Sequence, residues 1–204
     1  MIVKLAKSVG ERTVSNKEEQ LLNLLKHYRH DWLNDIQIVK GYLTLGKIED
    51  AQRHMDRIIF NAQDESRISQ IGDAELAYEL MTYNWVQKKV KLHYELDLEE
   101  EQDLRTVTVK YPTLKEWVQG ILKLSQDVCI EEADNNLYLS FDVKSDVLEL
   151  SLELDGQSNH REARKALQSL ENDIGHKDQR MHCEKLESQE WMVTIVLPVD
   201  DVRV

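Results

Sequence analysis

Hydrophobic side chains recur at helical spacing through the first quarter of the chain, from about residue 16 to residue 45. A helix turns about 100° per residue, so positions three or four apart share a face. One face, which we call the apolar seam, comprises Leu21, Leu25, Tyr28, Trp32, Ile36, Val39 and Leu43. The opposite face, the polar stripe, comprises Asn23, His27, His30, Asn34, Gln37 and Gly41. Most solvent-facing helix surfaces carry Lys and Glu, so an uncharged stripe with two imidazoles indicates a surface that meets another molecule.

Residues 16–71 are predicted to form a helical hairpin, preceded by a leader over residues 1–15. Ser15 and Glu18 have the capping-box spacing of a helix start, and Gly46 is the expected end of the first helix. A second helical pattern follows at once and fills the rest of this range. Because the link between the two helices is so short, they must pack antiparallel.

The apolar seam is too long for the hairpin alone to bury. From Leu21 to Leu43 it extends about 33 Å at the helical rise per residue, so an element of similar length must lie against it. A second copy of the hairpin would serve, which predicts a dimer built on a four-helix bundle. The alternative is that the C-terminal part of the chain folds back over the seam.

After Gly72 the periodicity changes, and residues 72–204 are predicted to form an α/β domain. Helices are expected to begin at Asp73 and Pro112 and to cover residues 160–171. The expected strands cover residues 90–96, 107–109, 137–143, 147–154, 181–187 and 191–197. An acidic loop is expected at 99–103 and a hairpin turn at 144–146. Helices on one side of a mixed or antiparallel sheet would complete an α+β chain.

Composition and charge exclude several classes of partner. The 204 residues carry a net charge of −12 and show no basic face, which argues against nucleic acid and anionic membranes. The two cysteines, Cys129 and Cys183, form no CxxC pair and are expected to be reduced thiols. No signal peptide or membrane-spanning apolar run is evident. These features predict a soluble, cytoplasmic protein.

His30 is the strongest candidate for chemistry. It projects from the polar stripe, so packing does not consume it, and a neutral imidazole can accept a phosphoryl group and pass it on. Asp31 would orient the ring and select one tautomer, while Lys26 and Asn34, one turn to either side, would contact phosphate oxygens. The alternative is a surface histidine without a role.

Metal and nucleotide sites are poorly supported. His27 and His30 are spaced i, i+3 rather than the i, i+4 of a zinc helix, and no third strong ligand is nearby. His176, His182 and Cys183 form a second cluster with equally poor spacing, so no metal is predicted. No GxxxxGK, GxGxxG or GxSxG motif occurs. The tryptophans at apolar positions, expected in the core, are Trp85, Trp117 and Trp191.

The segment Arg29-His30-Asp31-Trp32, with Asn34 and Gly41 in register, resembles the dimerisation and phosphotransfer helix of sensor histidine kinases of the citrate-sensing type. Within that group it is most similar to the phosphorelay phosphotransferases that initiate sporulation. The resemblance extends to Ala62-Gln63-Asp64-Glu65-Ser66 and to residues 76–85.

This resemblance implies that His30 is phosphorylated, that the chain is a homodimer with a four-helix bundle, and that its C-terminal domain is a degenerate histidine-kinase ATPase domain. Kinases of this type carry an Asn-containing helix and glycine-rich boxes. Here the helix over 114–131 has no Asn, and Asp155-Gly156 is isolated. The resemblance therefore implies a phosphotransferase with no bound cofactor rather than an ATP-dependent kinase.

In that family, phosphoryl passes from the aspartyl phosphate of one response-regulator receiver domain to the histidine, and then to a second regulator that controls sporulation. Mg²⁺ is expected on the receiver domain. The residues expected to contact these partners are Asn23, His27, Asn34 and Gln37. The alternatives are an ATP-dependent sensor-type histidine kinase and a non-catalytic dimeric scaffold for response regulators.

Overall fold

The computed structural model describes residues 16–98, 104–144, 147–175 and 179–198. The leader, the proposed cap Ser15, the acidic loop, most of the 144–146 turn and His176 lie outside the described residues. By its contacts the chain divides into two units, between Asp56 and Arg57. Each unit is described by itself.

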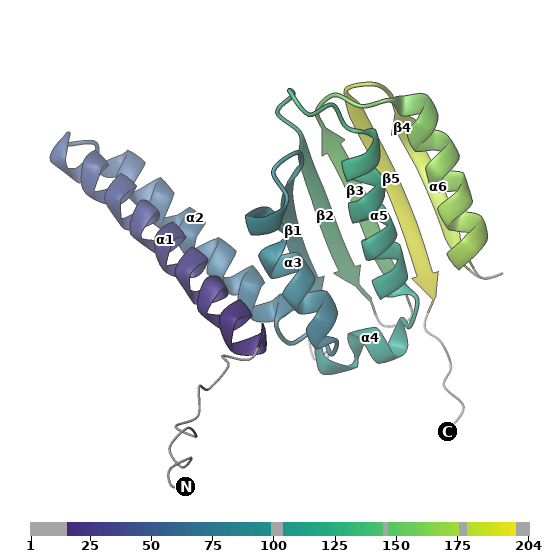
Figure 1. Cartoon of the computed structure of the whole chain (residues 1–204), viewed down its shortest axis with the longest axis horizontal. Coiled ribbons are helices and arrows are strands. Elements are labelled where there is room, and N and C mark those ends of the chain that lie inside the picture. The colour runs from purple at the N-terminus through teal and green to yellow at the C-terminus, as the bar shows by residue number, and fades with distance from the viewer. Residues whose placement is uncertain (1–15, 99–103, 145–146, 176–178, 199–204) are drawn as a thin grey trace, which may run out of the picture. The chain divides into compact units, whose positions relative to one another are not determined.

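The helical hairpin consists of α1 (Asn16–Thr44) and α2 (Ile48–Ile68), as predicted (Figure 1). Gly46 lies between them with a φ of 71°, a left-handed conformation that glycine adopts without a steric penalty. The backbone N–H of Lys47 donates to the carbonyl of Tyr42 at 2.9 Å, which satisfies one of the last carbonyls of α1.

Inside the first unit, a polar contact joins the two helices. His54 of α2 is buried, and its Nε2 lies 3.0 Å from Oδ1 of Asp35 on α1. The ring centroids of Tyr42 and His54 are 6.3 Å apart. Asp35 and Tyr42 thereby identify the side of α1 that faces α2.

The second unit is built on a five-stranded mixed sheet. Its elements are α3 (Ala74–Val86), β1 (Lys91–Leu98), a 3₁₀ turn (Leu104–Thr106), α4 (Val107–Lys110), α5 (Leu114–Val128), β2 (Asn136–Val143), β3 (Val147–Asp155), α6 (His160–Ile174), β4 (Arg180–Leu186) and β5 (Glu190–Pro198). The strand order is β1-β2-β3-β5-β4; β1 and β2 are parallel, and the other neighbours are antiparallel. Figure 1 shows α3, α5 and α6 against one face of the sheet. The α+β class and the mixed sheet are confirmed.

Alternating side chains account for this packing. Along β2 and β3 every second residue is buried, so one face of the sheet carries the core and the other faces solvent. Trp117 of α5 and Trp191 of β5 are fully buried in this core as predicted, whereas Trp85 is half-buried. α3 begins where expected: Oδ1 of Asp73 accepts the backbone N–H groups of Glu75 and Leu76 at 2.8 and 2.9 Å. These bonds, with Lys115 nearby, lower the pKa of Asp73.

The strand predicted at 107–109 is wrong, because these residues belong to α4. Val-Thr-Val alternates, but three residues are too few to separate a strand from a helical turn. The preceding 3₁₀ turn leads the chain into helix, Val107 is buried, and its carbonyl accepts the N–H of Tyr111 at 2.9 Å. The backbone N–H of Thr108 donates to the carbonyl of Ile71 at 3.4 Å, so this segment forms hydrogen bonds without pairing to a strand.

The unit division falls inside α2, whereas the sequence placed the change of periodicity near residues 70–73. The last turn of α2 explains the difference, because Ile68 and the following Ile71 are buried in the core of the second unit. A helix that is continuous in sequence therefore contributes to two sets of contacts.

Two glycines with positive φ offer a matched test of this fold. Gly72 has a φ of 93°, and a Cβ there would lie 2.4 Å from the backbone oxygen of Arg105; at Gly46 a Cβ would meet nothing within 4 Å. We expect Gly46→Ala to cost about 1 kcal/mol of unfolding free energy from the left-handed conformation alone. Gly72→Ala should cost more than about 2 kcal/mol, because backbone must also move. Urea unfolding of both variants measures this, and equal losses would contradict the close approach at Gly72.

Candidate functional site

His30 lies on α1 with its side chain 82% exposed. Its Nδ1 is 3.3 Å from Oδ1 of Asp31, whose side chain is 58% exposed. A contact of this length between exposed groups adds little to stability, but it biases the ring toward the tautomer that carries hydrogen on Nδ1. The geometry thus directs the lone pair of the imidazole to Nε2.

The other candidate site residues of α1, besides His30 and Asp31, are also exposed. These residues are Asn23, Lys26, His27, Asn34 and Gln37. Residues three and four positions apart on a helix have Cβ atoms about 5–6 Å apart, so Lys26, His27 and Asn34 border His30. The structure therefore places all of the predicted site residues on one solvent-exposed surface of a single helix.

The apolar seam remains largely uncovered in the hairpin. Exposure of its residues runs from 43% at Tyr28 to 57% at Leu21, with Val39 half-buried. The centre of the seam lies about 70° around α1 from the side marked by Asp35 and Tyr42. α2 therefore covers one edge of the apolar surface and leaves the rest exposed.

No group of three or more His, Cys, Asp or Glu side chains suited to a metal ion occurs within the described part of the chain. His182 and Cys183 lie next to each other on β4, so their side chains point to opposite faces of the sheet. No helix among the described residues is long and apolar enough to span a membrane.

The segment after Asp155, which the sequence singled out as a fragment of a nucleotide box, is tied into the fold. Only residues 156–159 separate β3 from α6. The N–H groups of Gly156 and Ser158 donate to the carbonyls of Gln189 and Ser188 at 3.0 and 2.7 Å. The indole N–H of Trp191 donates to Oγ of Ser158 at 2.9 Å. These backbone N–H groups are thus paired within the fold.

Asn135 anchors this segment and was missed from the sequence. It is 2% exposed, and its Oδ1 accepts the N–H of Gln157 at 2.8 Å. Its Nδ2 donates to the carbonyls of Lys89, Ile130 and Ala133 at 2.7–3.2 Å. A Cβ at Gly156 would lie 2.4 Å from this Oδ1. Gly156 thus serves close packing against a buried amide, a reason that no local pattern reveals.

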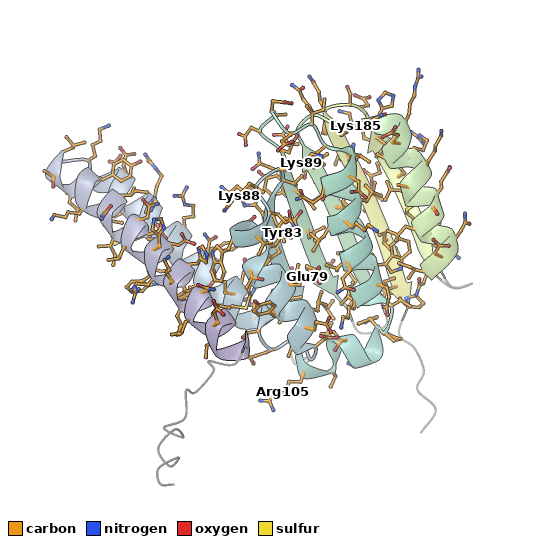
Figure 2. The ribbon with its side chains drawn as sticks, viewed as in Figure 1. Glu79, Tyr83, Lys88, Lys89, Arg105 and Lys185 are labelled. Atoms are coloured by element: carbon orange, nitrogen blue, oxygen red, sulfur yellow. The ribbon has the colours of Figure 1, made fainter. Side chains whose placement is uncertain are left out.

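α5, which contains no Asn, is packed on two sides. Toward α6, a Cβ at Gly120 would lie 2.3 Å from Cδ1 of Leu170, so the two helices are in close contact. Toward α3, the amide of Gln119 donates to Glu79 at 2.7 Å, and Lys115 lies 2.8 Å from Glu75. Figure 2 shows Glu79 and Tyr83 on the part of α3 beside α5. Neighbouring helices therefore occupy both flanks of α5.

Comparisons with known proteins can now be set beside this geometry. Residues 11–71 match the α-helical domain of SpoOB-type sensor kinases, and residues 73–198 match the C-terminal domain of sporulation initiation phosphotransferase B. The chain belongs to the sporulation initiation phosphotransferase B family. The resemblance inferred from the His30 segment is thereby confirmed.

A curated member of this family, sporulation initiation phosphotransferase B of Bacillus subtilis (strain 168), is 31% identical over 136 residues, covering 67% of this chain and 69% of that protein. Similar solved structures include the Acinetobacter baumannii histidine kinase AdeS, at 10% identity and a TM-score of 0.41, covering 84% of this chain and 98% of that one. Another is the blue-light activated histidine kinase of Erythrobacter litoralis EL346, at 14% identity and a TM-score of 0.44. That match covers 85% of this chain and 60% of the other. Family membership rests on the sequence matches alone.

Asp64 lies in the Ala62–Ser66 segment that carries part of the family resemblance, and sequence reasoning gave it no role. Its side chain is 3% exposed, and its Oδ1 is buried without a hydrogen-bond partner in the described structure. Nη1 of Arg67 is 3.9 Å away and donates to the carbonyl of Leu96 at 3.1 Å. Burial raises the pKa of Asp64. A carboxylate in this place costs stability at neutral pH, because its charged form is desolvated.

Two asparagines test whether the segment after β3 is held as described. Asn135→Ala removes the buried anchor and leaves several backbone groups without partners, so we expect a loss on the order of 3 kcal/mol of unfolding free energy. Asn159→Ala removes only an exposed N-cap of α6 and should cost about 1 kcal/mol. Chemical denaturation of both variants measures the two losses. A cost at Asn135 no larger than that at Asn159 would mean that the amide is not an anchor.

Proposed function

We propose that this chain is a phosphorelay phosphotransferase. His30 takes a phosphoryl group from the aspartyl phosphate of one response-regulator receiver domain and passes it to the aspartate of a second regulator that controls sporulation. The observation that carries the proposal is the exposed His30 imidazole, with Nδ1 next to Asp31, in a chain of this phosphotransferase family. We expect the chain to act in the cytoplasm.

Each transfer is a substitution at phosphorus. The lone pair on Nε2 of His30 forms the N–P bond as the bond from phosphorus to the partner's carboxylate oxygen breaks, and the electron pair of that bond stays on the carboxylate. The hydrogen on Nδ1 remains in place, so the phosphorylated ring carries a positive charge that the Asp31 carboxylate stabilises. The second transfer reverses these steps with a different aspartate, and its direction follows the relative stability of the two partners' aspartyl phosphates.

The neighbours of His30 have two roles, which are binding of the phosphoryl group and binding of the receiver domain. Lys26 and Asn34 contact the phosphoryl oxygens, since both lie one turn from the ring and offer N–H donors. Asn23, His27 and Gln37 contact the docked receiver domain. Mg²⁺ is bound by the receiver domain, and this chain contributes a positioned nucleophile and no cofactor.

We further propose that two copies associate through the apolar seam into a four-helix bundle. In such a bundle each helix has two neighbours, which lie in directions roughly at right angles to each other. On α1 the seam lies about 70° from the side that faces α2, close to the direction in which the second neighbour is expected. Burying the seam in this way leaves the polar stripe, on the opposite face of α1, open to partners.

Phosphorylation tests the role of His30. When the chain is mixed with a phosphorylated receiver domain, it should gain acid-labile, base-stable phosphate. His30→Ala should lose this label by at least about 10²-fold, because the nucleophile is gone. His160→Ala, which removes an exposed histidine of α6, should keep it. Full labelling of the His30 variant would refute the assignment.

The same experiment separates the alternatives. Labelled ATP with Mg²⁺ and no regulator should leave the chain unlabelled, whereas a sensor-type kinase would label itself. A non-catalytic scaffold would bind receiver domains yet show no phosphate flow that depends on His30.

Light scattering tests the dimer. The wild-type mass should be twice the 23.9 kDa of one chain. Leu25→Asp and Ile36→Asp each place a carboxylate in the seam and should reduce the mass to that of one chain, since a buried unpaired charge is strongly unfavourable. Leu45→Asp, outside the seam and 71% exposed, is the matched control and should stay dimeric. A wild-type mass of 23.9 kDa would favour the alternative in which the C-terminal part covers the seam.

A further inference from the structure

Asp64, near the end of α2, is a buried acid that the proposed phosphotransfer does not use. It is 3% exposed, and within the described part of the chain its Oδ1 has no hydrogen-bond partner. A buried carboxylate without a donor is much less stable than its neutral form, because nothing replaces the hydration that it has lost. An acid in such a place is uncommon in folded proteins and calls for a physical explanation.

A donor for Asp64 is close by but is bonded elsewhere. Arg67 follows Asp64 by three residues on α2, so the two side chains share one face of the helix. Nη1 of Arg67 donates to the carbonyl of Leu96 at 3.1 Å and lies 3.9 Å from Oδ1 of Asp64. It would have to move about 1 Å to reach the length of a guanidinium–carboxylate bond. One nitrogen therefore stands between two acceptors and is bonded to one of them.

The acceptor that Arg67 uses belongs to the edge strand of the sheet. β1 is the first strand in the strand order, so one side of it has no neighbouring strand. On that strand the side-chain amide of Asn84, from α3, bonds to the N–H and the carbonyl of Leu92, each at 2.8 Å. Side chains of two helices thus occupy backbone groups of an edge strand. The bond from Arg67 to Leu96 fastens the end of α2 to β1.

We propose that Asp64 and Arg67 form a proton-controlled latch between α2 and β1. While Asp64 is neutral, Arg67 stays bonded to Leu96 and the latch is closed, which is the arrangement in the structure. When Asp64 ionises, its carboxylate is a stronger acceptor for the guanidinium than the carbonyl of Leu96. Arg67 then turns to Asp64 and the latch opens. This device is independent of the chemistry at His30.

The groups that face Asp64 set the pH range of the latch. Burial raises the pKa of Asp64, the charge of Arg67 lowers it, and the charge of Glu95 on β1 raises it again. The neighbouring Tyr94 of β1 stays neutral, because burial and the charges of Glu65 and Asp64 raise its pKa. Asp64 therefore ionises at a higher pH than an ordinary aspartate, whose pKa is 3.8. The latch is closed on the acid side and opens as the pH rises through the raised pKa.

The latch acts where the chain passes from one unit to the other. The division between the units falls inside α2, and the part of the helix from Arg57 onward belongs to the second unit. Ile68, at the end of α2, is buried in the core of that unit. Apolar packing therefore holds the end of the helix at all pH values, and the latch adds a hold on β1 that depends on pH.

Hydrogen–deuterium exchange of the full chain over a series of pH values tests the latch. Asp64→Asn keeps the shape of the side chain and is neutral at every pH, so it should keep the latch closed. At pH 8 we expect β1 to exchange about tenfold more slowly in this variant than in the wild type. The difference should shrink as the pH falls toward 3.8. The matched control is Asp56→Asn, an exposed position of the same helix, which should follow the wild type throughout.

Arg67→Gln separates a latch from a buried charge that is merely costly. Its side chain is 49% exposed, so the substitution leaves the core intact, and circular dichroism checks the fold. With a latch, β1 exchanges rapidly in Arg67→Gln, and adding Asp64→Asn does not slow it. With a costly charge alone, Asp64→Asn slows the exchange of β1 in both backgrounds.

That second outcome would overturn the inference, as would equal exchange of β1 in Asp64→Asn and the wild type at pH 8. None of these measurements depends on phosphate transfer, so the proposed function stands or falls separately.

Discussion

The hairpin of α1 and α2 cannot bury its own apolar surface, and the arrangement of the candidate site depends on this constraint. One edge of the apolar surface of α1 faces α2, where Asp35 meets His54 at 3.0 Å. The seam from Leu21 to Leu43 remains exposed about 70° away. Under the proposed function a second copy of the hairpin covers the seam. The polar stripe of α1, on the far side, then keeps contact with solvent.

Under the proposed function, that constraint also accounts for the simplicity of the site. His30 lies on an exposed face of α1, with Oδ1 of Asp31 3.3 Å from its Nδ1 and with Lys26, His27 and Asn34 nearby. Such a site is sufficient under that proposal, because the reactive acyl phosphate and its metal come with the partner. The chain then supplies a nucleophile, whose tautomer Asp31 biases, and a surface that binds and releases the receiver domain.

Much of this could be predicted from the sequence, because the signals are local. Helical spacing predicted the hairpin, Gly46 predicted the turn between its helices, and Asp73 predicted the start of α3. Alternation of apolar and polar residues correctly predicted five of the six expected strands. The prediction failed at 107–109, because three alternating residues fit a helical turn equally well. The contacts of His54, Asn135 and Asp64 could not be predicted, since each depends on residues that only the fold brings near. The contact division inside α2 has no counterpart in the sequence pattern, because the periodicity of the helix does not change where its contacts do. The boundary predicted at residues 71 and 72 coincides with the place where the two family matches meet.

In the second unit, close contacts fix α5 between its neighbouring helices, and both flanks of α5 are occupied. Gly120 allows Leu170 of α6 to approach closely, and Gln119 bonds to Glu79 of α3. The backbone N–H groups of the segment after Asp155 donate to the side chain of Asn135 and to carbonyls of the β4–β5 turn. Each of these contacts stabilises the unit. Under the proposed function, in which this chain binds no nucleotide, these groups serve packing alone.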